Sequence, residues 1–291
     1  MKEALSDVLN LLDLEQIEVN MFRGISPDEG WQRVYGGQVI GQALVAASRT
    51  VEDESRIAHS LHGYFLRPGD TTIPIVYSVD RIRDGKSFTT RRVIAVQRGK
   101  AIFSMSVSFQ VMEEGLHHQM PMPDAASPYD CPSQEELRES YIQDIPEKYR
   151  KNFLDRSDPI EMRFQDGMND FRPDPMPAHQ RVWIKAVDTM PDDERLHQCV
   201  LAYASDMTLM DNAIRPHGIG WTEENFQTAS LDHAMWFHEP FRVDQWLLYY
   251  QDSPYSGGAR GFNRGSFYTQ GGSLIASAAQ EGLMRLHHPP S

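Results

Sequence analysis

The chain has 291 residues, enough for two domains of ordinary size or for one fused pair of repeats. Its formal net charge is −13 and its basic residues are scattered, which argues against a nucleic-acid surface. No apolar run approaches the roughly 20 residues of a membrane span. The two cysteines, Cys131 and Cys199, lie far apart, which predicts reduced thiols and neither a disulfide framework nor a metal knuckle.

The beginning of the chain predicts a helix over residues 4–18, whose leucines have roughly helical spacing. Residues 1–14 carry acidic residues among these leucines, where a signal peptide would have an apolar core. The sequence ends His-Pro-Pro-Ser, without a peroxisomal targeting tripeptide. We therefore expect a cytoplasmic protein. After the turn at Gly36 and Gly37, residues 39–48 are apolar almost all round, which predicts a helix buried on most sides.

The same order of elements is predicted twice. Strand-like runs follow the buried helix at residues 59–66, 73–83, 88–97 and 101–111, and the last alternates apolar residues with serines. Residues 113–158 are rich in Pro, Asp, Glu and Ser, with one short helix predicted near 134–141. The second half then offers a strand at 180–187, a helix at 195–209, and strands at 228–236, 245–251, 261–269 and 274–284.

The two halves also match in sequence. Residues 99–109 align with 272–282 without a gap, so that Val107 corresponds to Gln280, and residues 43–49 can be laid on 200–206. Matches in a fixed order predict a duplicated domain. We expect an α+β fold of two fused repeats, each an antiparallel sheet wrapped around its own helix, with domains at 1–115 and 158–291 and a linker at 116–157. The polar residues of the second copy suggest an active site in that copy only.

The chain resembles a known family at several segments spread over nearly its whole length. These segments are VYGGQ (34–38), HSLHGYFLRPGD (59–70), DGKSF (84–88), YASD (203–206), RPHGIG (215–220), LDHAMWFH (231–238) and QEG (280–282). Together they resemble the bacterial type II (TesB-like) acyl-CoA thioesterases and their peroxisomal relatives, which are double-hotdog proteins. The resemblance implies hydrolysis of fatty acyl-CoA to free fatty acid and CoA, no metal or redox cofactor, and a homo-oligomer, either a dimer or a tetramer.

The resemblance also implies the catalytic residues. In the family an aspartate on the second helix, a hydroxyl residue before the Asp-His strand and a glutamine on the last strand hold the attacking water. By position these are Asp206, Ser230 and Gln280. The hydroxyl residue is often threonine, so Ser230 departs from the pattern and lacks the methyl group that would fix its rotamer.

The chemistry of thioester hydrolysis fits these residue types. The reaction needs a water nucleophile, a base and donors for the oxyanion, and a thiol leaving group with a pKa of about 8.5 demands no general acid. A position late in its helix and an apolar setting should raise the pKa of Asp206. Taken alone, Asp206 could equally cap a helix, and Gln280 and Ser230 could be structural residues of their strands.

Substrate contacts are predicted in the first half. Gly36 and Gly37 offer backbone amides at a helix N-terminus, although a tight turn explains a Gly-Gly pair as well. The loop residues Gly85, Lys86 and Ser87, together with Arg91, are candidates for the CoA phosphates, and a solvated charged face explains the basic residues equally well. Among the histidines, His59 is the one to test; no zinc motif and no Gly-x-Ser-x-Gly elbow is present.

Two other functions remain open from sequence. A hydratase or dehydratase of acyl thioesters would use a His and Asp pair such as Asp232 and His233, and a non-catalytic acyl-CoA binding protein would keep the pocket without turnover. A turnover assay discriminates between them. Aromatic residues in the runs 64–65 and 235–237 support the expected homo-oligomer, because they could form an exposed sheet face.

Overall fold

The structure is a computed structural model of the chain. It describes residues 2–27, 33–143, 145, 147, 150, 158–168, 174–221, 223 and 225–287. The final His-Pro-Pro-Ser and residues 144, 146, 148–149 and 151–157 of the predicted linker lie outside the described residues.

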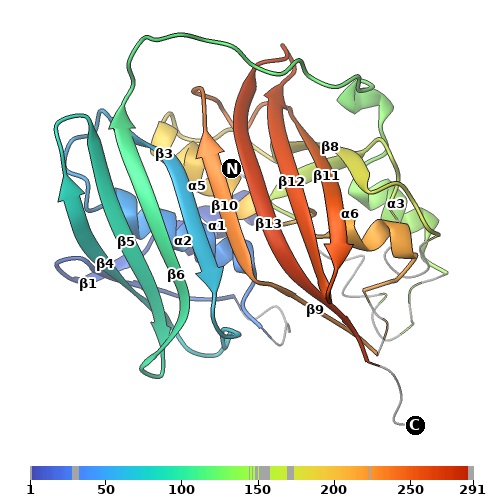
Figure 1. Ribbon diagram of the computed structural model, residues 1–291, viewed down its shortest axis with the longest axis horizontal. Coiled ribbons are helices and arrows are strands. Elements are labelled where there is room, and N and C mark those ends of the chain that lie inside the picture. The colour runs from blue at the N-terminus through green and yellow to red at the C-terminus, as the bar shows by residue number, and fades with distance from the viewer. Residues whose placement is uncertain are drawn as a thin grey trace.

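The strands of the described residues form one continuous, antiparallel, 13-stranded sheet (Figure 1). The first half contributes β1 (Glu15–Glu18), β2 (Met21–Gly24), β3 (Arg56–Phe65), β4 (Ile75–Asp84), β5 (Phe88–Gln97) and β6 (Lys100–Val111). The second half contributes β7 (Ile160–Phe164), β8 (His179–Ala186), β9 (Phe226–Ser230), β10 (Asp232–Phe237), β11 (Leu247–Gly257), β12 (Arg260–Thr269) and β13 (Leu274–Leu286).

The strand order is the same on both sides of a central seam. The order β1-β2-β4-β5-β6-β3-β10-β13-β12-β11-β8-β7 places β3 beside β10, with six strands outward on each side, and β9 pairs with β13 off this path. Hydrogen bonding between β3 and β10 makes one sheet of the two repeats. The duplicated α+β layout is therefore present, whereas the domain boundaries at 115 and 158 stay a prediction.

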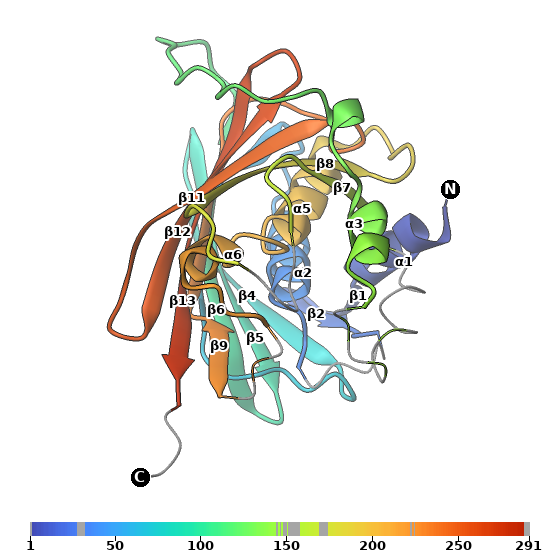
Figure 2. The same ribbon diagram turned by 90° about the vertical axis from the view of Figure 1, so that its right-hand side faces the viewer.

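The two long inner helices lie side by side in the concave face of the sheet (Figure 2). Among the described residues the helices are α1 (Glu3–Leu12), α2 (Gly36–Ser48), α3 (Gln134–Ser140), α5 (Glu194–Ala204) and α6 (Asp211–Ile214), with 3-10 turns η1 (Pro128–Asp130) and η2 (Arg215–His217). The pair is antiparallel. Tyr35, before α2, donates to the Tyr203 carbonyl near the end of α5, and Arg195, at the start of α5, donates to the Ser48 carbonyl at the end of α2. From Gly37 to Ser48 every residue of α2 is buried, as its apolar sequence predicts.

Two predicted helices end earlier than expected, and one predicted strand is interrupted. The first helix stops at Leu12, because residues 15–18 pair with β2 at the sheet edge. The helix predicted to run to Leu209 stops at Ala204. There the Ser205 hydroxyl donates to the Ala202 carbonyl, and the Tyr249 hydroxyl donates to the Ser205 carbonyl, so these carbonyls at the helix end have partners. The strand predicted over 228–236 is broken at Leu231 into β9 and β10.

The segment after β6 crosses to the far edge of the second half (Figure 1). Gln119 binds the β12–β13 turn through the Gly272 carbonyl and the Leu274 amide. Beyond it, Met122 and Ala125 pack on a small apolar cluster made of Cys131, Trp183, Trp246, Leu248 and Tyr268. In the part of the chain that the structure describes, no helix is long and apolar enough to cross a membrane.

Candidate active site

Asp206, Ser230 and Gln280 meet at one point of the second half. The Gln280 side-chain amide donates to Asp206 Oδ1 over 2.6 Å and to Ser230 Oγ over 3.0 Å. Gln280 is fully buried, and the Asp206 side chain is only 7 % exposed. The structure thus brings together the three residues that the sequence had named, from positions up to 74 residues apart.

The breaks in the secondary structure create this meeting point. Asp206 lies just beyond the end of α5, after Ser205, so its side chain is not held in the helix. Ser230 is the last residue of β9, opposite Gly282 of β13, and the chain then bends at Leu231 to continue as β10. Gln280 lies two residues before Gly282 on β13, and therefore reaches both partners from the same inner face.

The carboxyl group of Asp206 has an unusual electrostatic environment. Burial raises its pKa from 3.8 to about 6, against the lowering effect of hydrogen bonds from the Gln280 side chain and the Gly37 amide. Desolvation wins because the carboxylate loses more hydration than two neutral donors replace. At neutral pH the group is ionised and basic enough to accept a proton from water.

Gly36 and Gly37 bring the N-terminus of α2 against Asp206. A Cβ atom at Gly36 would lie 2.6 Å from Asp206 Oδ2, and one at Gly37 would lie 2.2 Å from the Tyr203 carbonyl oxygen. Neither position has room for a side chain, so glycine is required for the close approach of α2 to the end of α5. The positive end of the α2 dipole therefore faces the carboxylate. Both glycines thus lie beside Asp206, and their contact with substrate stays a prediction.

Apolar and aromatic side chains surround the polar group. A Cβ atom at Gly36 would also lie 3.0 Å from the Phe65 ring, which packs on Phe103 with 4.9 Å between the ring centroids. On the other side, Met210 lies against Gly282. Such a wall excludes water and strengthens every electrostatic interaction within it.

Sequence reasoning did not place two further buried residues at the site. His233, on β10, has Nε2 2.9 Å from Ser205 Oγ and Nδ1 3.9 Å from Asp206 Oδ1. Asn263, on β12, is fully buried and lies directly opposite Gln280 in the strand register. The alternation along β10 gave a signal for His233, because it shares the inner face with Met235. Nothing in the sequence gave the register that pairs Asn263 with Gln280.

The other predicted substrate contacts lie at the opposite end of α2. This helix is about 20 Å long at 1.5 Å per residue, and its far end leads to Thr50. Gly85 and Lys86 contact Arg56 through their carbonyls, beside Thr89. Ser87 belongs to the same loop. In the folded protein this loop, which holds Gly85, Lys86 and Ser87, therefore lies at the far end of α2 from Asp206.

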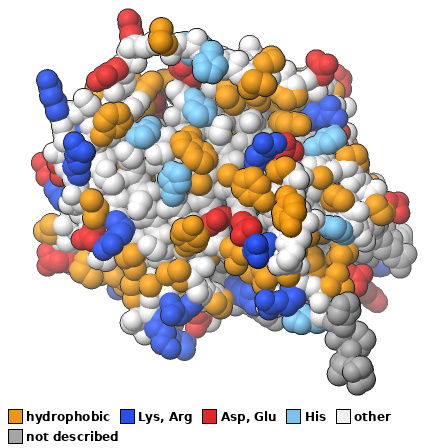
Figure 3. Space-filling model, in the orientation of Figure 1, with side chains coloured by type: hydrophobic (Ala, Val, Ile, Leu, Met, Phe, Trp, Pro, Cys, Tyr) orange, Lys and Arg blue, Asp and Glu red, His pale blue; other side chains and the backbone are white. Residues whose placement is uncertain are grey.

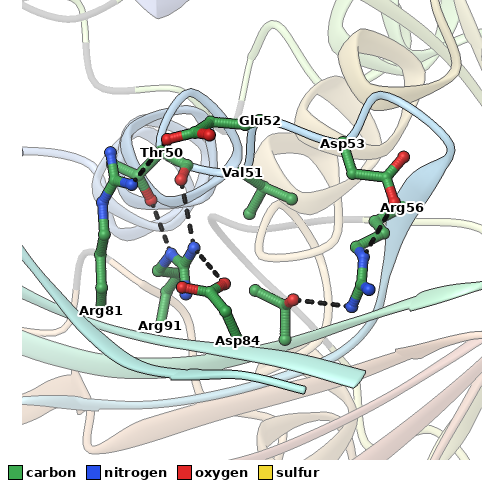
Figure 4. A pocket seen from close by; sticks show the side chains of 9 residues that line it. Thr50, Val51, Glu52, Asp53, Arg56, Arg81, Asp84 and Arg91 are labelled. Atoms are coloured by element: carbon green, nitrogen blue, oxygen red, sulfur yellow. Dashed lines mark hydrogen bonds and ion pairs between the residues drawn. The ribbon is translucent and has the colours of Figure 1, made fainter. Parts of the chain in front are cut away.

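Arg91 is buried and hydrogen-bonded within the protein, which argues against the predicted contact with CoA. It lines a cavity of about 290 Å³ beyond the end of α2 (Figure 4). Its guanidinium is buried and donates to Thr50 Oγ1 at 2.9 Å, to the Thr50 carbonyl at 3.2 Å and to Asp84 Oδ1 at 2.7 Å. The sequence pattern could not show this, because inward and outward arginines look alike in a strand of alternating polarity.

His59 also lies away from Asp206. Its ring packs edge-on against exposed Phe88 with 5.5 Å between the centroids, near the end of β3 that carries Arg56. Burial, and secondarily the charge of His62, lowers the pKa of His59. The pair proposed for a hydratase does not form either: Asp232 accepts from the Glu281 amide, whereas His233 binds Ser205. No group of three potential metal ligands is found among the described residues.

Comparison with known proteins follows the same division of the chain. The family model described as acyl-CoA thioesterase matches residues 150–283, and that of the acyl-CoA thioesterase N-terminal domain matches residues 27–110. Acyl-CoA thioesterase 2 of Haemophilus influenzae is 39 % identical over 285 residues, which cover 98 % of this chain and 99 % of the relative. The chain belongs to the acyl-CoA thioesterase family. It is accordingly a thioester hydrolase, as the sequence motifs predicted.

Solved structures confirm the double-hotdog fold of this family member. The crystal structure of an acyl-CoA thioesterase II from Mycobacterium marinum is 44 % identical, covers 98 % of this chain and 99 % of that one, and has a TM-score of 0.77. A hotdog-fold protein of unknown function from Alicyclobacillus acidocaldarius, 17 % identical, has a TM-score of 0.76 over the whole of both chains. The predicted α+β double hotdog is therefore confirmed.

Proposed function

We propose that this thioesterase hydrolyses fatty acyl-CoA to free fatty acid and CoA, with the attacking water activated by Asp206 and held with the help of Ser230 and Gln280. The observation that carries the proposal is the buried Asp206 carboxylate, which is hydrogen-bonded to Gln280 at 2.6 Å and has its pKa raised to about 6. A base with a pKa near the working pH combines availability with proton affinity.

The three side chains have complementary roles in positioning water. Asp206 accepts the proton of the water as its oxygen attacks the thioester carbonyl. Gln280 Nε2 is engaged by Asp206 and Ser230, and its buried Oε1 accepts no hydrogen bond from the described residues. This second acceptor fits the other hydrogen of the same water, and it directs an oxygen lone pair toward the substrate.

The oxyanion and the leaving group need little more. The first turn of α2 offers backbone N–H groups and the positive end of a helix dipole beside Asp206, which suits the negative charge that develops on the carbonyl oxygen. The proton on Asp206 then returns to the departing thiolate, whose pKa of about 8.5 makes it a good leaving group. The balance of the reaction requires no other reactant.

The first experiment is free-thiol release from a panel of acyl-CoA substrates. We expect Asp206→Asn, which keeps the size and removes the base, to lower kcat by about 100-fold or more, and Ser230→Ala and Gln280→Leu to lower it less. For the wild type, turnover should fall as the pH drops below about 6, because the base becomes protonated.

The matched control is Asp232→Asn, which neutralises a carboxylate on strand β10 that accepts a hydrogen bond from the Glu281 backbone amide. It should keep most of its activity. Full turnover by Asp206→Asn would refute the role of this residue. A wild type that binds acyl-CoA without turnover would favour the non-catalytic binding protein.

We also propose a homo-oligomer and a cytoplasmic location. The oligomer is supported by the outer face of the central strands, where Tyr64 is 62 % and Trp236 is 37 % exposed. Figure 3 shows this face, where hydrophobic and histidine side chains are exposed near the middle beside a few charged ones, with further charged side chains at the rim. The location is supported by Cys131 and Cys199, which are both free and buried, as is usual in a reducing compartment.

A further inference from the structure

His233 lies behind Asp206, and the mechanism above gives it no part. Its side chain is completely buried, with Nε2 2.9 Å from Ser205 Oγ. The other ring nitrogen, Nδ1, lies 3.9 Å from Asp206 Oδ1 and has no hydrogen-bond partner among the described residues. A buried polar atom without a partner requires a physical explanation, above all next to a catalytic base.

The hydrogen bonds of Ser205 determine which ring nitrogen carries the proton. The Ser205 hydroxyl has one hydrogen, and its oxygen lies 2.9 Å from both the Ala202 carbonyl oxygen and His233 Nε2. The carbonyl can only accept, so the hydroxyl hydrogen belongs to that bond. Ser205 Oγ must then accept from Nε2–H, which leaves Nδ1 with a lone pair directed toward Asp206.

We propose that His233 is a positioning residue for the hydrolysis: its Nδ1 lone pair accepts a hydrogen bond from Asp206 once the carboxyl group has taken the proton of the attacking water. The inference rests on the proposed role of Asp206 as the base. A lone pair facing an ionised carboxylate repels it, which explains a separation longer than a hydrogen bond. When Asp206 is protonated, the same lone pair becomes an acceptor at that position.

The proton balance is simple. The bond from hydrogen to the water oxygen breaks, and a new bond forms to an oxygen of Asp206, while the water oxygen bonds to the thioester carbon. The proton stays on Asp206, donates a hydrogen bond to Nδ1, and leaves with the thiolate when the carbon–sulfur bond breaks. His233 remains neutral throughout, in keeping with burial that lowers its pKa to about 3.

The groups around the ring support this arrangement. On its own strand, Asp232 alternates to the outer face and binds the Glu281 amide. From β3 the register brings Gly63 beside it, and β13 carries the uncharged Gln280. On β11, the Tyr249 hydroxyl donates to the Ser205 carbonyl, and burial, with the Asp206 charge second, raises the pKa of Tyr249. Asp206 is therefore the ionised group that these elements direct at Nδ1.

The test is the pH dependence of kcat/KM for acyl-CoA hydrolysis by the full-length protein. In His233→Gln the side-chain NH2 keeps a donor for Ser205, while no acceptor remains at the position of Nδ1, so protonated Asp206 loses that stabilisation. We expect the acid limb to move about 0.5–1 pH unit lower and kcat to fall about three- to tenfold, as the loss of one hydrogen bond allows. His62→Gln, on the outer face of neighbouring β3, is the control and should keep the wild-type limb.

Two further measurements do not depend on that variant folding. Ser205→Ala frees the ring to protonate Nδ1, which would then donate to ionised Asp206 and also move the acid limb lower. In the wild type, ¹⁵N NMR of labelled histidine should show His233 as the Nε2–H tautomer. An Nδ1–H tautomer, or an unshifted acid limb in folded His233→Gln, would overturn the inference.

Asp206→Asn separates this inference from the proposed function. Full turnover by that variant would defeat both. If Asp206→Asn is inactive while the acid limb of His233→Gln equals that of the wild type, only the role of His233 fails.

Discussion

At the residue scale, the environment rather than the type of side chain distinguishes the candidate base. Asp206 and Asp232 both have a raised pKa, with desolvation as the largest cause for each. Asp206 is almost fully buried beside an apolar wall, whereas Asp232 remains partly exposed on the other face of the sheet. Two carboxylates of the same half therefore have different surroundings, and the proposed mechanism assigns water activation to the more deeply buried one, Asp206.

Asp206 should cost the folded protein stability at neutral pH. The pKa of Asp206 is about 6 in the folded protein and 3.8 in the ordinary, solvated state. The folded protein therefore binds this proton more tightly than the unfolded chain does, and the resulting stabilisation is complete below about pH 3.8 and lost above about pH 6. We expect Asp206→Asn to raise the free energy of unfolding by about 3 kcal/mol near pH 8 and by about half as much near pH 5. Urea denaturation at both pH values measures this.

The control for this prediction is Asp7→Asn, which changes an exposed carboxylate on α1. It should show no comparable gain at either pH. An equal gain for Asp206→Asn at both pH values would mean that the stabilisation has another origin than removal of a buried charge.

At the element scale, the antiparallel pair of helices has two ends with different contents. At one end, the start of α2 meets Asp206. At the other, Arg91 fills the space beyond α2 and donates to Thr50 and Asp84. In the strand register Arg91 lies opposite Val107, and Asn263 lies opposite Gln280. Because the sequence repeat aligns Val107 with Gln280, Arg91 corresponds to Asn263. The two ends are therefore equivalent positions of the duplicated fold, and only one of them carries Asp206 hydrogen-bonded to Gln280.

This equivalence predicts a structural role for Arg91. We expect Arg91→Met to lower the free energy of unfolding by about 2–4 kcal/mol, because several buried hydrogen bonds are lost together. The KM for acyl-CoA should not change. Arg92→Met, which removes an exposed arginine paired with Asp80, is the control and should cost less than about 1 kcal/mol. A large rise in KM for Arg91→Met at normal stability would instead support the contact with CoA that the sequence suggested.

At the scale of the whole molecule, the two faces of the sheet have opposite surroundings. The inner face is covered by α2 and α5, and the segment after β6 covers part of the outer face of the second half. Much of the outer face of the central strands carries small, uncharged and aromatic residues, among them Ser106, His62 and Trp236, whose ring packs on His62. Asp232 and the ion pair Arg260–Glu281 add charge toward one end of these strands. The ion pairs Arg92–Asp80 and Arg264–Asp252 lie on strands further out. An exposed aromatic patch with few charges, flanked by charged residues, is the pattern of a protein interface.

A charge on this face should separate the proposed oligomer. We expect light scattering to give a multiple of the 33.3 kDa chain mass for the wild type and a smaller mass for Trp236→Glu. Val19→Glu, which adds the same charge at an exposed apolar residue outside the central face, should leave the mass unchanged. A wild type that runs as a monomer would rule out the oligomer.

The sequence by itself determined the elements and their order. The apolar run of α2, the alternation of β6 and the aligned repeats predicted the duplicated fold, because these patterns reflect local geometry and burial. The resemblance also named Asp206, Ser230 and Gln280. Edge strands such as β1 escaped prediction, since four exposed residues carry no pattern.

Only the tertiary structure decided what each residue faces. The break at Leu231, the register that pairs Asn263 with Gln280, and the inward direction of Arg91 depend on contacts between distant segments. The raised pKa of Asp206 and the free Nδ1 of His233 follow from the same packing. A sequence pattern shows which side of a helix or strand is buried. The pKa and the hydrogen bonds of a buried side chain depend on its neighbours, which only the tertiary structure brings together.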